Sequence, residues 1–357
     1  MKRILTIRLA LLIVCALSIN TAFSQDANTK EVVKKQTKKK VVPCKWHKAN
    51  NFSEGLAKVE NAKDKWGFIN KSGKVVIPYK WESAGDFNEG LAYVEDADEK
   101  YGFIDKAGKL VIPCTWNDIE DFCEGLAAVE DDNKKRGFID KSGILVIPCT
   151  WENADEFSEG LAAVEDDNGK YGYIDKTGKL VIPCTWKDTR YFSEGLAAVK
   201  DANGKWGFID KSGNVVIPCK WEYAYVFSEG LAAVEDDNGK FGFIDMSGQI
   251  AIPCEWSYAW RFKEGLVAVR DRSLMHGFID KTGKLVVPCT WRDFDEFSEG
   301  LAKVQDANGK WGFINKTGQV VIPCMWDDAK RISEGLACVQ DANGKWGFID
   351  KTGKVMI

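Results

Sequence analysis

The residue types that could do chemistry recur at fixed positions along this 357-residue chain instead of gathering at one place. Eight of the 11 cysteines each follow a proline: Cys44, Cys114, Cys149, Cys184, Cys219, Cys254, Cys289 and Cys324. Tyr79 fills the same slot once, which indicates a packing position, so we expect buried thiols, with a ladder of disulfides as the alternative. A zinc site is disfavoured, because the chain has no C-x-x-C pair and its two histidines, His47 and His276, lie far apart in the sequence.

Repetition also argues against acid–base catalysis. A glutamate precedes a glycine at the same place in nine segments, as at Glu194 and Glu229. General acid and base work needs two groups in different environments, whereas identical copies have identical environments. Acidic turns such as residues 165–169 suggest calcium, but their glycine stands at the wrong offset for an EF-hand loop. We therefore predict no catalytic residue, no metal and no cofactor.

The elements that must position these residues are copies of one unit. All nine prolines are spaced by 35 residues, at positions 43, 78, 113, 148, 183, 218, 253, 288 and 323. From residue 43 to residue 357 the chain therefore holds nine complete units of 35 residues. A perfect period of this kind indicates a repeat architecture.

One unit reads as an all-β meander. In residues 161–186, three short apolar runs are separated by turns at Asn168-Gly169 and at Gly178. The third run ends at Pro183, which cannot donate to a ladder and is therefore expected at a strand end or edge. A short connection with room for one helical turn leads to the next meander. Every connection begins with a tryptophan, and eight of the nine carry a phenylalanine six residues later, which we interpret as core residues. Three strands cannot bury their own apolar face, so the units must stack.

The positions within the repeat at which the array begins and ends indicate whether the stack of units is open or closed. Val41-Val42 occupy the same place in the repeat as Met356-Ile357, so the ends duplicate part of one strand. Because closed propellers often join their ends by complementary strands, this phase favours an open solenoid or superhelix over a closed propeller-like ring.

The repeated motifs resemble the WG-repeat, or KWG-repeat, family of bacterial proteins. The motifs are Lys-Trp-Gly-Phe-Ile-Asp-Lys at 205–211, Val-Val-Ile-Pro at 215–218 and Phe-Ser-Glu-Gly-Leu-Ala at 227–232. The name-giving tryptophan is kept in four units (Trp66, Trp206, Trp311 and Trp346) and replaced in the others by Tyr101, Arg136, Tyr171, Phe241 and His276. The resemblance implies an all-β, often exported repeat protein and brings no catalytic residues with it.

The start of the chain predicts export. Residues 1–24 have a basic start, an apolar run over 9–19 and a small-residue pattern at 22–24, typical of a signal peptide. Residues 25–42 are rich in lysine and read as a flexible tether, followed by nine WG-type repeats over 43–357. We expect a periplasmic, cell-surface or secreted protein without a transmembrane segment after signal removal.

Charge makes nucleic acid a poor partner for the repeats. Residues 1–40 hold nine Lys and Arg against two acids, which leaves 40 bases and 51 acids in the rest, a net charge of −11. Nucleic-acid binding depends on Lys and Arg that neutralise phosphates, so an acidic array repels such a ligand.

The most informative positions are those where the units differ. The connection between the tryptophan and the phenylalanine is small and acidic in most units. Units five to seven instead carry Arg190, Tyr191, Tyr223, Tyr225, Tyr258, Trp260 and Arg261. These residue types are enriched at binding hot spots, although packing over their own loops is the alternative reading.

The sequence thus predicts an exported, non-catalytic repeat scaffold that binds a protein or a glycan at the cell envelope through these seven residues. A structural or spacer protein without a specific ligand is the alternative, and an enzyme is the least favoured class.

Overall fold

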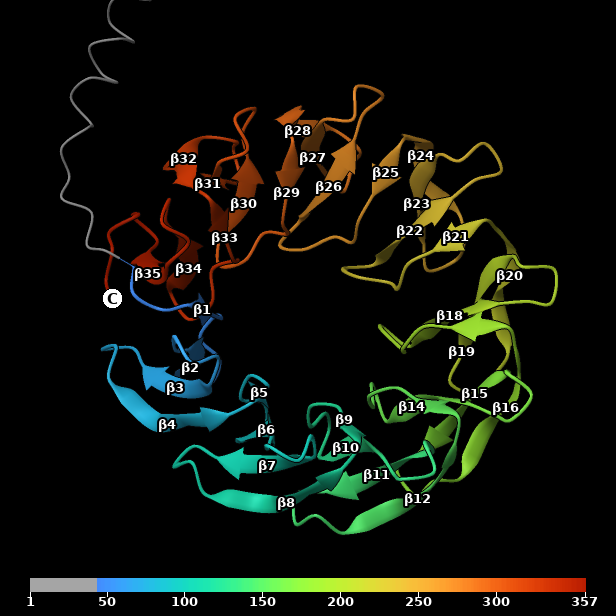
Figure 1. Ribbon diagram of the computed structural model, residues 1–357. Helices are drawn as coiled ribbons and strands as arrows, with labels where there is room; N and C mark the ends of the chain where they lie inside the picture. The colour runs from blue at the N-terminus through green and yellow to red at the C-terminus, as the bar shows by residue number, and fades with distance from the viewer. Residues whose placement is uncertain (1–43) are drawn as a thin grey trace, which may run out of the picture. The chain divides into compact units, whose positions relative to one another are not determined.

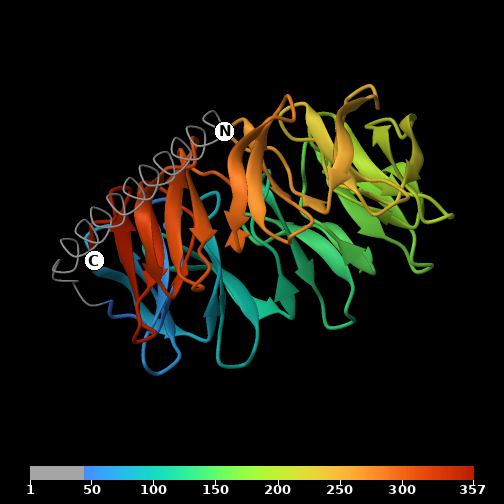
Figure 2. The ribbon, with the colours of Figure 1, turned by 90° about the horizontal axis from the view of Figure 1, so that it is seen from above.

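Nine small antiparallel sheets stand side by side around a closed ring (Figures 1 and 2). The computed structural model describes residues 44–357, so the predicted signal peptide (1–24) and tether (25–42) lie outside the described residues. Eight sheets have four strands and one has three, in simple meander order. The all-β fold with nine repeats is confirmed, whereas the prediction of an open solenoid is wrong, because the sheets form a nine-bladed propeller ring.

Each blade begins with a strand of two residues that faces the middle of the ring (Figure 1). This strand lies in the connection where we expected a helical turn. The nine inner strands are β1 (Lys48–Ala49), β5 (Ser83–Ala84), β9 (Asp118–Ile119), β13 (Asn153–Ala154), β17 (Asp188–Thr189), β21 (Tyr223–Ala224), β25 (Tyr258–Ala259), β29 (Asp293–Phe294) and β33 (Asp328–Ala329).

The middle of each blade is a hairpin of two buried five-residue strands. The second strands are β2 (Leu56–Glu60), β6 (Leu91–Glu95), β10 (Leu126–Glu130), β14 (Leu161–Glu165), β18 (Leu196–Lys200), β22 (Leu231–Glu235), β26 (Leu266–Arg270), β30 (Leu301–Gln305) and β34 (Leu336–Gln340). The third strands are β3 (Trp66–Asn70), β7 (Tyr101–Asp105), β11 (Arg136–Asp140), β15 (Tyr171–Asp175), β19 (Trp206–Asp210), β23 (Phe241–Asp245), β27 (His276–Asp280), β31 (Trp311–Asn315) and β35 (Trp346–Asp350).

The outer strands have seven residues and run along the rim of the ring (Figure 1). They are β4 (Val75–Trp81), β8 (Leu110–Trp116), β12 (Leu145–Trp151), β16 (Leu180–Trp186), β20 (Val215–Trp221), β24 (Ile250–Trp256), β28 (Leu285–Trp291) and β32 (Val320–Trp326). The repeat proline was predicted to lie at a strand end or edge, and it lies inside this edge strand. An outer strand pairs on one side only, so a residue without an N–H is tolerated there.

The outer strand has a bulge opposite the third strand, and this bulge explains the glycine of the repeat motif. Between the pairs Tyr171↔Trp186 and Tyr173↔Ile182, the outer strand has two more residues than its partner. A Cβ added to Gly172 would lie 2.4 Å from the carbonyl oxygen of Ile182. Any side chain at this glycine would therefore push the two backbones apart.

Phenylalanine pairs form the core between neighbouring blades. The ring centroids of Phe138 and Phe157 lie 4.8 Å apart, and those of Phe208 and Phe227 lie at the same distance. These rings are fully buried, and Ile332 replaces the later ring once. Of the nine connection tryptophans, four are buried (Trp46, Trp81, Trp221 and Trp326) and five are half-buried. The phenylalanine is thus the deeper core residue.

Both ends of the ring share one outer strand in the ninth blade. Strand β35 pairs with Val355 through Ile349, and with Trp46 through Trp346. A Cβ added to Gly347 would lie 2.7 Å from Sγ of Cys44 and 3.1 Å from the carbonyl oxygen of Ile357. The last outer strand is therefore assembled from two halves, one from each end of the ring.

This composite strand shows why the open array was the wrong prediction. Met356-Ile357 do repeat the phase of Val41-Val42, but Trp46 and Val355 both pair with β35, so the two ends complete one outer strand. The usual contact between blades is also kept across the closure, where the rings of Phe52 and Phe348 lie 4.9 Å apart.

The recurrent glutamates join neighbouring blades. The side chain of Glu89 accepts the N–H of Gly125 in the next blade at 3.1 Å, and its Oε2 lies 2.9 Å from Nζ of Lys141. The same contact closes the ring, where Glu334 accepts the N–H of Gly55 at 3.1 Å. Since all nine copies occupy such positions, their recurrence has a structural cause.

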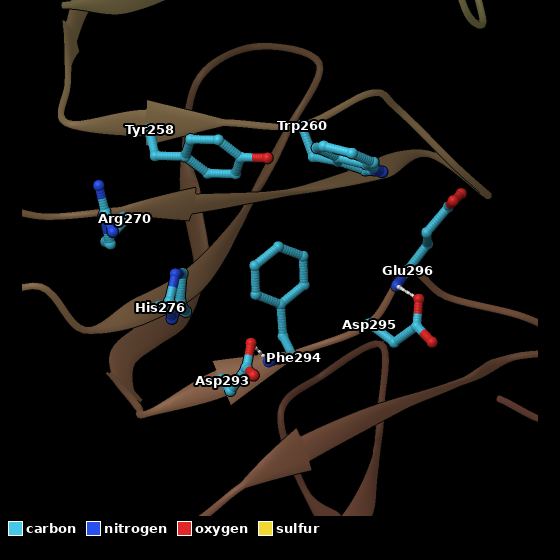
Figure 3. Close-up of a pocket in the computed structure, with 8 residues that line it drawn as sticks. All are labelled: Tyr258, Trp260, Arg270, His276, Asp293, Phe294, Asp295 and Glu296. Carbon is cyan, nitrogen blue, oxygen red and sulfur yellow. Dashed lines mark hydrogen bonds between the residues drawn. The ribbon is translucent and has the colours of Figure 1, made fainter. Parts of the chain in front are cut away.

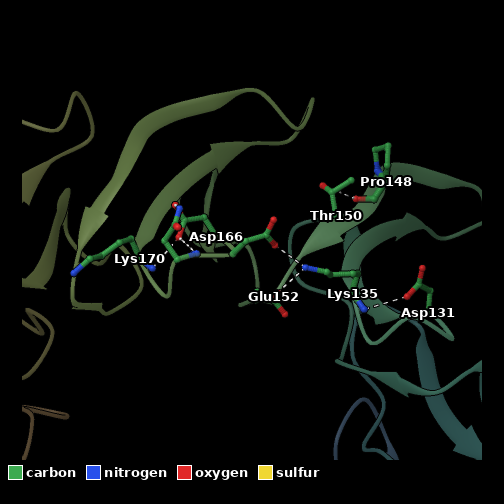
Figure 4. A network of polar contacts seen from close by, with 9 residues as sticks. Asp131, Lys135, Pro148, Thr150, Glu152, Asp166 and Lys170 are labelled. Carbon is green, nitrogen blue, oxygen red and sulfur yellow. Dashed lines mark hydrogen bonds and ion pairs between the residues drawn. The ribbon is translucent and has the colours of Figure 1, made fainter.

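Lysines in the turns between second and third strands reach the following blade as well (Figure 4). Nζ of Lys135 lies 2.7 Å from Oε1 of Glu152 and 2.6 Å from Oδ1 of Asp167. In the acidic turn itself, Oδ1 of Asp166 accepts the N–H groups of Asn168 and Lys170, each at 2.9 Å. Turn geometry therefore accounts for the acidic residues that suggested calcium.

Candidate binding surface on the inner strands

All seven predicted ligand-binding residues lie on three neighbouring inner strands or in the turns that follow them. Tyr223 and Tyr258 begin β21 and β25, and Tyr225 and Trp260 directly follow these strands. The remaining three are Arg190, Tyr191 and Arg261. The propeller thus brings these positions together, 35 residues apart in the sequence, because every inner strand faces the middle of the ring (Figure 1).

Four of these aromatic side chains make one continuous row. Ring centroids lie 4.9 Å apart for Tyr223 and Tyr225, and 5.1 Å apart for Tyr225 and Trp260. Tyr258 stacks on Trp260 at 6.0 Å, and its hydroxyl lies 3.2 Å from that of Tyr225. All four are half-buried. They pack on neighbouring blades, and each keeps part of its surface exposed.

Arg190 contacts one end of this row, and Arg261 directly follows Trp260 in the chain. The guanidinium of Arg190 lies 5.1 Å from the ring centroid of Trp206 and donates to the hydroxyl of Tyr223 at 2.6 Å. Arg261 donates to Glu296 at 2.8 Å and to the hydroxyl of Tyr191 at 3.1 Å. The ion pair with Glu296 raises the pKa of Arg261. Each arginine therefore has a hydrogen-bond partner in another blade.

A cavity of about 420 Å³ opens beside the aromatic row, between β25 and β29 (Figure 3). Tyr258, Trp260 and Phe294 supply apolar faces to it. Its other lining residues are charged or polar: Arg270, His276, Asp293, Asp295 and Glu296. A cavity with flat apolar walls and hydrogen-bonding groups at its edges suits a small polar ligand or one residue of a polymer.

His276 lines this cavity at a position where seven other units have tryptophan, tyrosine or phenylalanine and one has Arg136. In the preceding blade, Phe241 occupies this position and lies 5.7 Å from the ring of Tyr258. The smaller imidazole of His276 packs 4.9 Å from Phe294, and its Nδ1 lies 3.0 Å from the carbonyl oxygen of Arg292. Burial lowers the pKa of His276, so the ring is neutral at pH 7.

Sequence reasoning missed Phe294, Arg270 and His276 as site residues. Phe294 is the single aromatic residue at the second inner-strand position, where six of the nine units have alanine. Comparing that single position across the nine units would have identified it.

Carboxylates dominate the inner turns on the other side of the row. Asp86, Glu120, Asp121, Asp155 and Glu156 occupy these turns in blades two to four, and we call them the acidic sector. Burial raises the pKa of Asp121 to about 6, with Glu156 and Asp86 adding to the effect. Burial also raises the pKa of Asp155 and of Glu156. The acidic sector thus holds negative charge in poorly solvated positions, which favours a cationic partner.

All ten cysteines of the described residues are free thiols. Cys44 and Cys338 are buried, and the other eight are half-buried. Burial raises the pKa of Cys149 and of Cys184 to about 11, so these thiols are protonated at neutral pH. The described part of the chain therefore contains thiols at the positions where a disulfide ladder was the alternative.

The comparisons with known proteins identify the repeat. A family model described as WG containing repeat matches ten consecutive segments: residues 34–65, 66–100, 101–134, 137–171, 171–206, 206–240, 241–273, 277–311, 311–346 and 346–357. No curated protein matches the chain. Within residues 44–357, no helix is long and apolar enough to span a membrane.

Two solved structures show similarity at 12% sequence identity. One is a computationally designed protein, Ika8, with a TM-score of 0.47 over 74% of this chain and 94% of that chain. The other is BamB from Moraxella catarrhalis, with a TM-score of 0.44 over 75% of this chain and 96% of that chain. The repeat match spans the whole ring, and the chain belongs to the WG-containing repeat family.

Proposed function

We propose that this protein is an exported, non-catalytic ring that binds a glycan or a protein segment at the cell envelope. The observation that carries the proposal is the half-buried aromatic row Tyr223–Tyr225–Trp260–Tyr258 beside the cavity of about 420 Å³. Aromatic side chains that are held in place and remain partly exposed lose little entropy when a ligand covers them.

A glycan is the ligand that the cavity favours. Trp260 and Tyr258 offer flat faces on which a sugar ring can stack, and Asp293, Asp295 and Arg270 lie within the same cavity to bond its hydroxyls. Planar charged groups around an aromatic platform satisfy the polar edge of a sugar while its apolar face is desolvated.

A basic protein segment is the second candidate, and the acidic sector favours it. Tyr191 lines a cavity of about 360 Å³ with Glu120, Asp155 and Glu156, so the aromatic and acidic regions adjoin. Lysine and arginine side chains would be attracted by both.

Export is proposed on sequence grounds, and the absence of catalysis on the structural role of the recurrent glutamates. The basic, apolar and small-residue order over residues 1–24 supports export. The structural use of the recurrent glutamates supports a binding role, because the most frequent acidic position already bonds the next blade.

A glycan array and a pull-down from envelope extract, each with matched variants, test the proposal. Trp260→Ala with Phe294→Ala removes apolar walls of the cavity, and we expect it to weaken glycan binding about 30-fold, which corresponds to about 2 kcal/mol. Asp155→Asn with Glu156→Gln serves as the control, which leaves the cavity intact and weakens only a basic protein ligand.

The outcomes separate the candidates. Loss in the first variant alone supports a glycan, and loss in the second alone supports a protein segment. A folded parent that binds nothing in either assay contradicts the proposal and favours a structural or spacer protein.

A further inference from the structure

Three potential metal ligands meet on blade one. His47 lies between Trp46 and β1, Glu60 ends β2, and Asp64 stands in the turn that leads to β3. Nδ1 of His47 lies 3.6 Å from Oε2 of Glu60 and 3.8 Å from Oδ1 of Asp64, and the three ligand atoms all lie within 4.8 Å of one another. The N–H of His47 also donates to the carbonyl oxygen of Glu60 at 3.1 Å, which fixes the first two ligands relative to each other.

The carboxylate of Glu60 is buried and only half satisfied. Glu60 is 2% exposed, and its Oε1 accepts a hydrogen bond from Nζ of Lys48 at 2.9 Å. Its Oε2 has no hydrogen-bond partner. An unpaired buried carboxylate oxygen is costly, and a cation beside it would remove that cost.

The trio occurs in one unit among nine. The position of His47 is taken by Glu82 in the second unit, and the position of Asp64 by Glu99. Five units carry glycine at the position of Asp64: Gly169, Gly204, Gly239, Gly309 and Gly344. Asp64 has a φ of 56°, a conformation that glycine adopts more easily, so turn geometry does not explain the aspartate.

We propose that His47, Glu60 and Asp64 bind one divalent first-row transition-metal ion such as Zn²⁺. Ligand atoms around a tetrahedral zinc with bonds of about 2.0–2.1 Å lie about 3.4 Å apart, so the two separations from Nδ1 of His47 need to shorten by only a few tenths of an ångström. The imidazole favours such an ion over Ca²⁺ or Mg²⁺, which select oxygen ligands. Lys48 occupies the other oxygen of Glu60 and leaves Oε2 for the metal.

The ion would fasten the closing segment of the ring to blade one. His47 directly follows Trp46, whose N–H donates to the carbonyl oxygen of Trp346 in blade nine at 3.2 Å. A metal bound only by the folded ring therefore raises the melting temperature, in proportion to the logarithm of its concentration above the dissociation constant.

Titration of the full chain with Zn²⁺, followed by calorimetry and thermal melting, tests this site. Asp64→Gly removes a ligand and introduces the residue that five other units carry there, so the fold is preserved. Glu99→Gly makes the matched change in unit two, where no histidine is present. We expect one Zn²⁺ per chain in the parent and in Glu99→Gly, and at least tenfold weaker binding in Asp64→Gly and His47→Gln.

Cobalt distinguishes this site from the thiols, because a charge-transfer band in the near ultraviolet appears only when Co²⁺ has a thiolate ligand. Binding without that band, lost in Asp64→Gly, supports the proposal. Absence of binding, binding unchanged in Asp64→Gly, or a thiolate band overturns it, as would Ca²⁺ binding as tightly as Zn²⁺.

Discussion

The carboxylate of Asp121 is buried and poorly hydrated, so its contribution to the stability of the fold depends on pH. Its pKa is raised from 3.8 to about 6, because it is buried beside Glu156 and Asp86. A carboxyl group with a raised folded pKa stabilises the fold fully at pH below its unfolded pKa, and this contribution is lost as the pH rises through the folded pKa.

We therefore expect Asp121→Asn to be more stable than the parent by about 1–3 kcal/mol at pH 8, since one unit of pKa shift corresponds to about 1.4 kcal/mol and partial solvation reduces the effect. The difference should vanish near pH 4. Urea denaturation at several pH values measures it. A constant difference between pH 4 and pH 8 would show that the effect is not electrostatic.

A second prediction at the residue scale compares two aromatic side chains of one connection. Phe192 is fully buried between blades, whereas Trp186 is half-buried at the end of β16. Phe192→Ala should cost about 3–5 kcal/mol, the range for a fully buried large aromatic, and Trp186→Ala should cost less. Chemical denaturation of both variants checks the order, and a larger loss for Trp186→Ala would contradict the placement of the core.

At the scale of the strand, the third strand and the outer strand fit together only through glycine. Gly172→Ala should destabilise blade four by about 3 kcal/mol, because its Cβ meets backbone on the outer strand that cannot rotate away. Gly160→Ala is the control, since nothing lies within 4 Å of its Cβ and only its φ of 88° opposes the change. Equal losses in thermal melts would indicate that contact with the outer strand is unimportant.

The strands were predictable to the extent that their pattern is periodic. The three longer strands of a blade correspond to the three apolar runs of the unit. The turns that separate these runs, at Asn168-Gly169 and at Gly178, were placed correctly. The inner strand was not predicted, because a strand of two residues is too short to show an alternation of apolar and polar residues. The end of the outer strand was placed at Pro183, although β16 continues to Trp186, because the sequence does not tell whether a proline marks a strand end or an edge.

The binding surface was predictable only in part, because part of it depends on how neighbouring blades pack. Tyr225, Trp260 and their neighbours stood out because they interrupt an acidic pattern. His276 and Phe294 lie in different segments of the unit, and a cavity between two blades depends on how the blades pack. A metal at His47 was disfavoured from the sequence because the chain lacks a second nearby histidine or a C-x-x-C pair. The carboxylates of Glu60 and Asp64 come close to His47 only in the folded blade.

For the whole molecule, closure makes a sharp prediction about a circular permutant. Ile357 and Pro43 stand at consecutive positions of the repeat, as Ile182 and Pro183 do. Joining Ile357 directly to Pro43 and opening the chain between Asn168 and Gly169 should therefore give a folded ring at least as stable as the parent. In an open array the two ends would be far apart, and the direct join would unfold the end units, which circular dichroism and thermal melting would detect.

Closure of the ring also means that some contacts of the first unit can form only after the last unit has been synthesised. Most bonds between blades join residues about one unit apart, as from Glu89 to Gly125, 36 positions on. The contact of Cys44 with Val339 spans 295 positions. While synthesis has reached only unit eight, Phe52 has no partner ring and the last blade offers an unpaired edge. Such a chain exposes apolar surface and an unpaired strand edge, through which it can aggregate with other copies. Addition of the ninth unit covers both and removes this tendency to aggregate.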